Sequence, residues 1–251
     1  PLLYDSNFTP KEAYNTVAAM IPASEWGGST AEEPNQYGRY FDSSFESDVN
    51  GWTNRGSTTL SLSSDEHFVG SSSLYVTGRT STWNGAQKAL NTATYKPDTE
   101  YSFSVNAKYT SGNATEPIAL KLQYKGSDGE THYSTVSEVT AFKGEWIQLA
   151  NKNYTIPTGA SDLYLYVETG ETTCDFYIDE AIAAIAGTTI IGAESSTVIL
   201  GDADLDKVIT SADLLIIKQA AEGGSVTGKA KQAADVNGDN IIDNTDAELV
   251  M

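Results

Sequence analysis

Residues 38–187 consist of short runs of alternating apolar and polar residues, separated by turns rich in Gly, Ser, Asn, Pro and Asp. In 101–109 the odd-numbered side chains are apolar, and the even-numbered ones are apolar in 118–124. A period of two places alternate side chains on opposite faces of a strand. Many short runs of this kind, with turn signals between them, are typical of a sandwich of two antiparallel sheets. We therefore predict a mainly β chain with a β-sandwich over residues 38–190.

The charge balance and the scarcity of Cys and His narrow the possible partners. The 251 residues include 34 acidic and 15 basic side chains, giving a net charge of -19. Such a surface repels nucleic acid and anionic lipid, so we expect neither a nucleic acid nor a membrane as partner. Cys174 is the only cysteine and there are two histidines, which leaves oxygen-ligated calcium as the metal to consider. The N-terminus has no signal-peptide pattern, and we expect a piece of a longer protein.

The first 21 residues predict a helix with no core to pack against. Thr9 and Glu12 have capping-box spacing, and Pro10 suits the first helical position. The run PLLYDSNFTPKEAYNTV resembles the closing segment of family 10 glycoside hydrolase barrels, which are xylanases. The resemblance implies that residues 1–21 are the remnant of such a barrel. Residues 22–37 are rich in Pro, Gly, Ser and Glu and are expected to be a linker.

The run DLYLYVE, residues 162–168, separates two kinds of side chain. Its leucines and valine fall on one face of the expected strand, and its two tyrosines and Glu168 fall on the other. Aromatic rings stack on sugar C–H surfaces and a carboxylate accepts hydrogen bonds from hydroxyls, which is the chemistry that a neutral glycan requires. The alternative is a second, partly buried face, since tyrosine is common on ordinary strands.

Several further runs occur in the order found in family 22 carbohydrate-binding modules and resemble them: WTNRG, WNGAQKAL, KLQYKGSDGETHYST, YTIPTGASDLYLYVET and FYIDEAIAAIAGT. The resemblance spans nearly all of residues 38–190 and implies a jelly-roll sandwich that binds xylan or, in some members, mixed-linkage β-glucan. The family's cleft residues correspond to Arg55, Trp83, Tyr133, Tyr164, Tyr166 and Glu168. Trp83 and a tyrosine would be apolar platforms, with Arg55 and Glu168 as polar anchors. Alternatively, Trp83 is a packed turn residue and the two charged residues form a surface ion pair.

Members of this family also bind a structural calcium ion. The resemblance implies Glu46 of SFES and Asp179 of FYIDE as ligands. These two carboxylates are equally consistent with turn chemistry, and the sequence names no full ligand set.

After residues 191–200, an expected linker, the composition changes to acidic loops and Ala/Lys/Leu helices. Residues 201–251 contain ten carboxylates and four lysines and include a repeat with a spacing of 33 residues. Each copy has the spacing of oxygen ligands found in a calcium loop. The first copy offers Asp202, Asp204, Asp206, the Val208 carbonyl, Thr210 and Asp213, and the second offers Asp235, Asn237, Asp239, the Ile241 carbonyl, Asp243 and Asp246. We predict two calcium ions, with a weaker first site because the usual loop glycine is Lys207 there and Asn240 in the second copy.

The residues before the first loop are β-branched and predict no entering helix, so the expected units are a loop followed by a helix. Two such units resemble type I dockerins, which bind cohesin domains of a cellulosome scaffold. The resemblance covers residues 200–251 and implies cohesin contacts at Ser211, Ala212, Lys218 and Gln219, and in the second copy at Asn244 and Thr245. The alternative is that Lys218 and Gln219 belong to an ordinary solvated helix face.

Together these features predict a non-catalytic targeting fragment of an extracellular, cellulosomal endo-1,4-β-xylanase. It would bind xylan through the sandwich and dock to a cohesin in the presence of calcium. The alternatives are part of a xylanase whose hydrolase domain is missing here, or a calcium-binding adhesion protein. A catalytic role needs the eight strand-helix units of the barrel, which this sequence lacks. A calcium sensor needs paired complete helix-loop-helix units.

Overall fold

The computed structural model describes residues 30–193, 198–206, 208–226 and 228–250. The predicted barrel remnant over residues 1–21 and the first part of the predicted linker lie outside these residues. Residues 30–37, the remainder of that linker, contain no helix or strand. They are tied to the sandwich by hydrogen bonds from Asn91 Nδ2 to the Thr30 carbonyl and from Glu32 N to Thr94 Oγ1.

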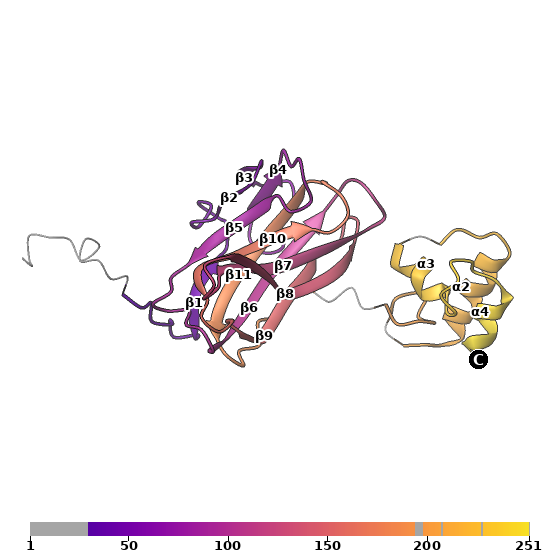
Figure 1. The fold of residues 1–251 in the computed structure, drawn as a ribbon. Helices are drawn as coiled ribbons and strands as arrows, with labels where there is room; N and C mark the ends of the chain where they lie inside the picture. The colour runs from indigo at the N-terminus through magenta and orange to yellow at the C-terminus, as the bar shows by residue number, and fades with distance from the viewer. Residues whose placement is uncertain (1–29, 194–197, 207, 227, 251) are drawn as a thin grey trace, which may run out of the picture.

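Two antiparallel sheets make up the larger part of the molecule (Figure 1). The first sheet has the order β3-β4-β11-β6-β9, and β1 also pairs with β11. Its strands are β1 (Arg39–Ser43), β3 (Thr59–Ser63), β4 (Ser73–Thr77), β6 (Glu100–Tyr109), β9 (Ile147–Thr155) and β11 (Phe176–Ile185). The second sheet has the order β2-β5-β10-β7-β8. Its strands are β2 (Thr53–Arg55), β5 (Gly85–Leu90), β7 (Thr115–Lys125), β8 (Thr131–Phe142) and β10 (Ser161–Thr169).

The apolar faces predicted from the period of two meet in one core between the sheets, which confirms the sandwich. From the first sheet it includes Tyr101, Phe103, Val105 and Ala107, and from the second Ile118, Leu120, Leu122, Leu163, Leu165 and Val167. Tyr124 packs at its margin. Phe103 is fully buried, with its ring centroid 5.9 Å from that of Tyr95 and 6.0 Å from that of Tyr154. Full burial of a side chain of this size contributes about 1.5–3 kcal/mol, so the core fixes which strand faces point inward.

Two buried charged residues hold loops at one end of the sandwich. Arg79 donates to the carbonyls of Thr82, Asn84 and Cys174 and to Thr169 Oγ1. Glu116 is fully buried, and its carboxylate accepts hydrogen bonds from the amides of residues 171 and 172 at 2.8 and 3.0 Å. A buried charge is tolerated where hydrogen bonds replace its water. These contacts fix the turn before β5 and the loop between β10 and β11.

The C-terminal region contains α2 (Ser211–Ala221), α3 (Gly228–Ala234) and α4 (Asn244–Leu249). Its small core is formed by Ala203, Ile217, Ala234 and Ala247. Each predicted loop is followed by a helix, as expected. The second loop is also preceded by α3, which the sequence analysis did not predict; its run GKAKQAA contains good helix formers. None of the helices in the described residues is both long and apolar enough to span a bilayer.

We predict that Gly85→Ala destabilises the sandwich. A Cβ at this position would lie 1.9 Å from the Val167 carbonyl oxygen of the neighbouring strand, so the strands must move apart. Such overpacking costs about 1–3 kcal/mol. Urea unfolding followed by tryptophan fluorescence measures this, since all four tryptophans precede the C-terminal module.

Ser61→Ala, at an exposed position of the edge strand β3, is the control and should leave the unfolding midpoint unchanged. Equal midpoints for Gly85→Ala and the control would show that the sheet absorbs the methyl group without loss.

Candidate functional site

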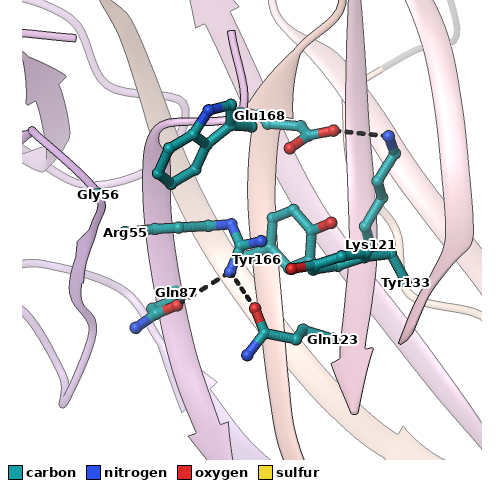
Figure 2. A pocket seen from close by; sticks show the side chains of 9 residues that line it. Arg55, Gly56, Gln87, Lys121, Gln123, Tyr133, Tyr166 and Glu168 are labelled. Carbon is teal, nitrogen blue, oxygen red and sulfur yellow. Dashed lines mark hydrogen bonds and ion pairs between the residues drawn. The ribbon is translucent and has the colours of Figure 1, made fainter. Parts of the chain in front are cut away.

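An open cleft of about 540 Å³ lies on the outer face of the second sheet. Its lining comes from β2, β5, β7, β8 and β10 and from the residues next to β2 and β5 (Figure 2). The lining residues are Arg55, Gly56, Trp83, Gln87, Lys121, Gln123, Tyr133, Tyr166 and Glu168. Five of the six predicted binding residues are therefore brought together. The sixth, Tyr164, is half-buried on β10 beside Gln123 and is outside this lining set.

The floor of the cleft is hollow around Glu168 because its neighbours are small. Glu168 on β10 is paired with Ala119 on β7. On the other side of β10, its neighbour is Gly85, the first residue of β5, where a Cβ would lie 3.7 Å from Glu168 Cα. Neither neighbour has a large side chain that would separate Glu168 from the cleft that it lines. A ligand can therefore approach the sheet closely here.

Arg55 lies across the centre of the cleft and is 7% exposed. Its guanidinium carbon is 3.7 Å from the ring centroid of Tyr166 and 5.6 Å from that of Tyr133. Nη1 donates to Gln123 Oε1 at 2.7 Å and to Gln87 Oε1 at 3.3 Å, as Figure 2 shows. A planar guanidinium suits both the stacking and the paired acceptors. Arg55 thus connects β2, at the edge of the sheet, to the middle strands.

Glu168 is paired with a cation that the sequence analysis did not identify. Lys121 Nζ lies 2.6 Å from Glu168 Oε1. The two side chains are 26% and 11% exposed, so water screens this pair only in part. The expected alternative, an ion pair between Arg55 and Glu168, is not among the contacts of the described residues, where Arg55 is held by glutamines instead.

Trp83 is 52% exposed and forms one wall of the cleft. The turn that carries it is fixed from below: Asn84 Oδ1 accepts from the Thr80 and Ser81 amides, and Arg79 donates to the Thr82 carbonyl. Gly56, at φ +67°, lies so close that a Cβ there would be 2.7 Å from a Trp83 ring atom. The indole is thus a rigid but solvent-exposed platform, unlike the packed turn residue considered as the alternative.

The tyrosines of the cleft have different roles. Tyr133 is 58% exposed and Tyr166 is 2% exposed, and their rings meet edge to face at 6.4 Å. Burial raises the pKa of the Tyr166 hydroxyl, with a smaller contribution from the Glu168 charge. Tyr133 therefore offers an exposed ring to the cleft, whereas the Tyr166 ring is covered by Arg55.

Gln87, Lys121 and Gln123 were not among the binding residues predicted from the sequence, although the alternation holds a signal for all three. Lys121 and Gln123 alternate with the core residues Leu120 and Leu122, so the period of two already placed them on the outer face. Gln87 has the same relation to the core residue Ala86. The alternation shows that these three side chains face outward, but it does not show that they line a cleft.

Glu46 and Asp179, the predicted ligands of a sandwich calcium, bind the same loop. Glu46 accepts hydrogen bonds from the amides of Ser71 and Ser72, and Asp179 accepts from those of Phe68 and Val69. The Ser71 hydrogen bonds lower the pKa of Glu46, whereas burial raises that of Asp179. Carboxylates that converge on one loop fit calcium, but the same contacts are also those of turn chemistry.

The first acidic loop brings three predicted ligands to one point. Carboxylate oxygens of Asp202, Asp204 and Asp206 lie within 4.8 Å of one another. Burial and then the neighbouring carboxylates raise the pKa of Asp204. Asp213 is buried and accepts hydrogen bonds from the Asp204 and Thr210 amides. A cluster of hard oxygen donors with closely spaced negative charges fits calcium. Lys207, predicted to weaken this site, lies outside the described residues.

The second loop has the same design. Asp235 accepts hydrogen bonds from the amides of Gly238, Asp239 and Asn240, which curls the loop around its first predicted ligand. Asn240 has φ +67°, the left-handed conformation that asparagine was expected to tolerate here. At the end of the loop, Asp246 is buried and serves with the N-cap Asp243 as the capping box of α4. Ile241, whose backbone carbonyl is the predicted ligand, has an exposed side chain.

The predicted docking residues lie on α2. Ser211, Ala212, Lys218 and Gln219 are all exposed. Leu215, between them in the sequence, is 57% exposed. Asn244 and Thr245 begin α4. The first helix therefore has exposed polar residues and one unburied large apolar side chain.

Two family models match the chain. Residues 39–175 match the family described as carbohydrate binding domain, and residues 200–251 match the dockerin type I domain. Endo-1,4-beta-xylanase Y of Acetivibrio thermocellus is 42% identical over 234 residues, which are 88% of this chain and 22% of that protein. A xylanase/beta-glucanase of Ruminococcus flavefaciens is 40% identical over 156 residues, 62% of this chain and 19% of that protein.

A solved structure covers the sandwich. The C-terminal family 22 carbohydrate binding module of Clostridium thermocellum Xyn10B, in which conserved amino acids of the cleft have a role in ligand binding, is 43% identical with a TM-score of 0.62. The match covers 62% of this chain and 100% of that one. By contrast, the chain spans about a fifth of the length of the first two relatives.

We predict that Lys121→Met destabilises the sandwich more than removal of a lysine from an exposed ion pair does. The change leaves the Glu168 carboxylate, 11% exposed, without its cation. The free energy of unfolding should fall by about 1–3 kcal/mol, less than for a fully buried pair because Lys121 is partly solvated. Glu168→Gln in the same chain should recover most of the loss, which a double-mutant cycle by urea unfolding measures.

The matched control is Lys125→Met, because the Lys125–Asp162 pair is 53% and 67% exposed. It should change stability by less than about 0.5 kcal/mol. If both lysine variants behave alike, the Lys121–Glu168 pair has no special role in holding the cleft.

Proposed function

Since the chain belongs to the carbohydrate-binding domain family, as a family 22 module followed by a type I dockerin domain, we propose that it targets a cellulosomal endo-1,4-β-xylanase to xylan. Both matched modules are non-catalytic, so this part of the protein contributes binding and docking. The observation that carries the proposal is the cleft with Trp83 and Tyr133 exposed on its walls and Glu168 at its floor.

The cleft chemistry supports a neutral glycan as ligand. The exposed rings of Trp83 and Tyr133 can stack on the C–H faces of sugars, which are apolar and carry no charge. The Glu168 carboxylate accepts hydrogen bonds and can orient sugar hydroxyls. Its charge is balanced by Lys121 at 2.6 Å, so a charged ligand is not needed to stabilise the site. An open cleft also allows a long chain to pass through without its ends being recognised.

Xylan is the first choice of ligand, and mixed-linkage β-glucan is the second. Xylan is favoured because the relatives are xylanases and share the sandwich. The glucan is kept because the Ruminococcus flavefaciens relative is named as both xylanase and beta-glucanase. Both ligands are β-linked chains of neutral sugars; the glucan has a hydroxymethyl group at C5 that xylose lacks, and it also contains β-1,3 linkages.

Trp83→Ala should weaken binding of xylohexaose and soluble arabinoxylan by about 30-fold or more, because a central aromatic anchor contributes about 2 kcal/mol or more. Calorimetric titration of the whole chain measures this, with mixed-linkage glucan oligosaccharides as the competing ligand. Trp146→Ala is the matched control, since Trp146 packs on Phe68 outside the cleft lining. A wild-type chain that binds none of these glycans would falsify the polysaccharide assignment.

For the C-terminal module we propose calcium-dependent binding to a scaffold cohesin through Ser211, Ala212, Lys218 and Gln219 of α2. The support is their shared exposure and the exposed Leu215 between them. Calcium neutralises the crowded carboxylates of both loops and so stabilises the start of α2 and α4. The protein is proposed to act extracellularly, where xylan and a cellulosome are accessible, and no role is proposed for nucleic acid or membrane.

Calcium titration should give three ions per chain: one in each loop, and one held in part by Glu46 and Asp179. Asp202→Ala and Glu46→Gln should each reduce the number to two, because each removes a ligand from a different site. Chelation with EDTA should lower the midpoint of thermal unfolding of the helices, measured by circular dichroism at 222 nm.

Asp175→Ala, an acidic residue outside all three ligand sets, is the control. Two ions in the wild type and in Glu46→Gln would remove the sandwich site and leave the loop sites standing.

A further inference from the structure

Two glutamines on the cleft floor have amide groups whose orientation is fixed by a neighbour. Arg55 Nη1 is a donor only, so the atom of Gln87 or Gln123 that faces it must be the carbonyl oxygen Oε1. The amide nitrogen Nε2 of each side chain is then on the opposite side. Figure 2 shows both nitrogens turned away from the guanidinium.

In the part of the chain that the structure describes, these amide nitrogens donate to no protein atom. Both glutamines line the cleft and are half-buried. The strand that carries Tyr166 lies between them: Gln87 is paired directly with Tyr166, and Gln123 with Tyr164. Two unused donors thus flank the centre of the cleft, on β5 and β7.

We propose that Gln87 and Gln123 are ligand-contacting residues whose Nε2 groups donate hydrogen bonds to oxygen atoms of the bound sugar chain. The inference rests on the proposed glycan binding and extends it. Glu168 supplies an acceptor for sugar hydroxyls, and the glutamines supply the donors that hydroxyl, ring and glycosidic oxygens require. The cleft then presents both partners of the hydrogen bonds that a neutral β-linked glycan can make.

The proposal also changes the expected role of Arg55. Its Nε is buried without a hydrogen-bond partner, and Nη1 is used by the two glutamines. Because Arg55 is 7% exposed and covered by tyrosine rings, it is a positioning residue rather than the main sugar anchor. Its guanidinium sets the amide orientation, and the amides contact the ligand.

Side-chain amide signals test this directly. In ¹H–¹⁵N spectra of the uniformly ¹⁵N-labelled whole chain, the Nε2 resonances of Gln87 and Gln123 should shift on titration with xylohexaose. The shifts should follow the dissociation constant measured by calorimetry. Single Gln→Met variants assign the two signals, and the amides of Gln148 and Gln232, outside the cleft lining, should not move.

Affinity measurements separate donation to the ligand from support of Arg55. Gln123→Met should weaken xylohexaose binding about 3- to 10-fold, the effect of one neutral hydrogen bond. Gln123→Glu keeps an acceptor for Arg55 but removes the donor, so it should weaken binding at least as much. Gln232→Met is the control and should bind as the wild type does.

The outcomes are distinct. Wild-type affinity in Gln123→Glu together with a loss in Gln123→Met would show that the glutamine only supports Arg55 and would overturn the proposal. Heat of binding without movement of the two amide signals would also overturn it, while glycan binding itself would stand. Absence of any binding heat in the wild type would remove the proposed function and this inference with it.

Discussion

Burial of one apolar face from each sheet is the constraint on which the rest of the structure depends. Strand side chains alternate with a period of two, so a core that fixes the inward residues also fixes the outward ones. In β10 the burial of Leu163, Leu165 and Val167 is what turns Tyr166 and Glu168 outward. A register shift of one residue would exchange the two sets and remove the cleft. Burial of the core is therefore sufficient to place the cleft residues on the outer face of the sheet.

The same constraint explains how much the sequence could predict. Alternation identified both core faces and the outward position of Glu168, and the spacing of Asp residues identified both acidic loops. Contacts between strands distant in sequence could not be read in this way: Lys121 meets Glu168 only because β7 pairs with β10. The order of strands in a sheet is a tertiary property. For the same reason the hydrogen bonds from Arg55 to Gln87 and Gln123 could not be predicted from the sequence.

Helix α3 was missed for a different physical reason. A segment of seven residues is too short to be stable alone and has little periodicity to detect. It forms because Ala234 at its end joins Ile217 and Ala247 in the small core of the C-terminal module. Packing, more than local propensity, decides such helices. By contrast, α2 and α4 carry capping boxes that mark their starts in the sequence.

The charged side chains are arranged differently in the two modules, and the arrangement determines which kind of ligand each module favours. In the sandwich, charges are compensated internally: Lys121 by Glu168, and Glu116 and Arg79 by hydrogen bonds from or to the backbone. The cleft is therefore complete before any ligand arrives, as expected for a rigid site that binds a neutral chain. In the first acidic loop, carboxylate oxygens of three aspartates lie within 4.8 Å of one another, and their mutual repulsion favours binding of a cation. Under the proposed function, calcium would act on the loops that precede α2 and α4 and not on the side chains of the polysaccharide cleft. The proposed glycan and cohesin sites would then be linked by tethering within one chain and not by a shared conformational change.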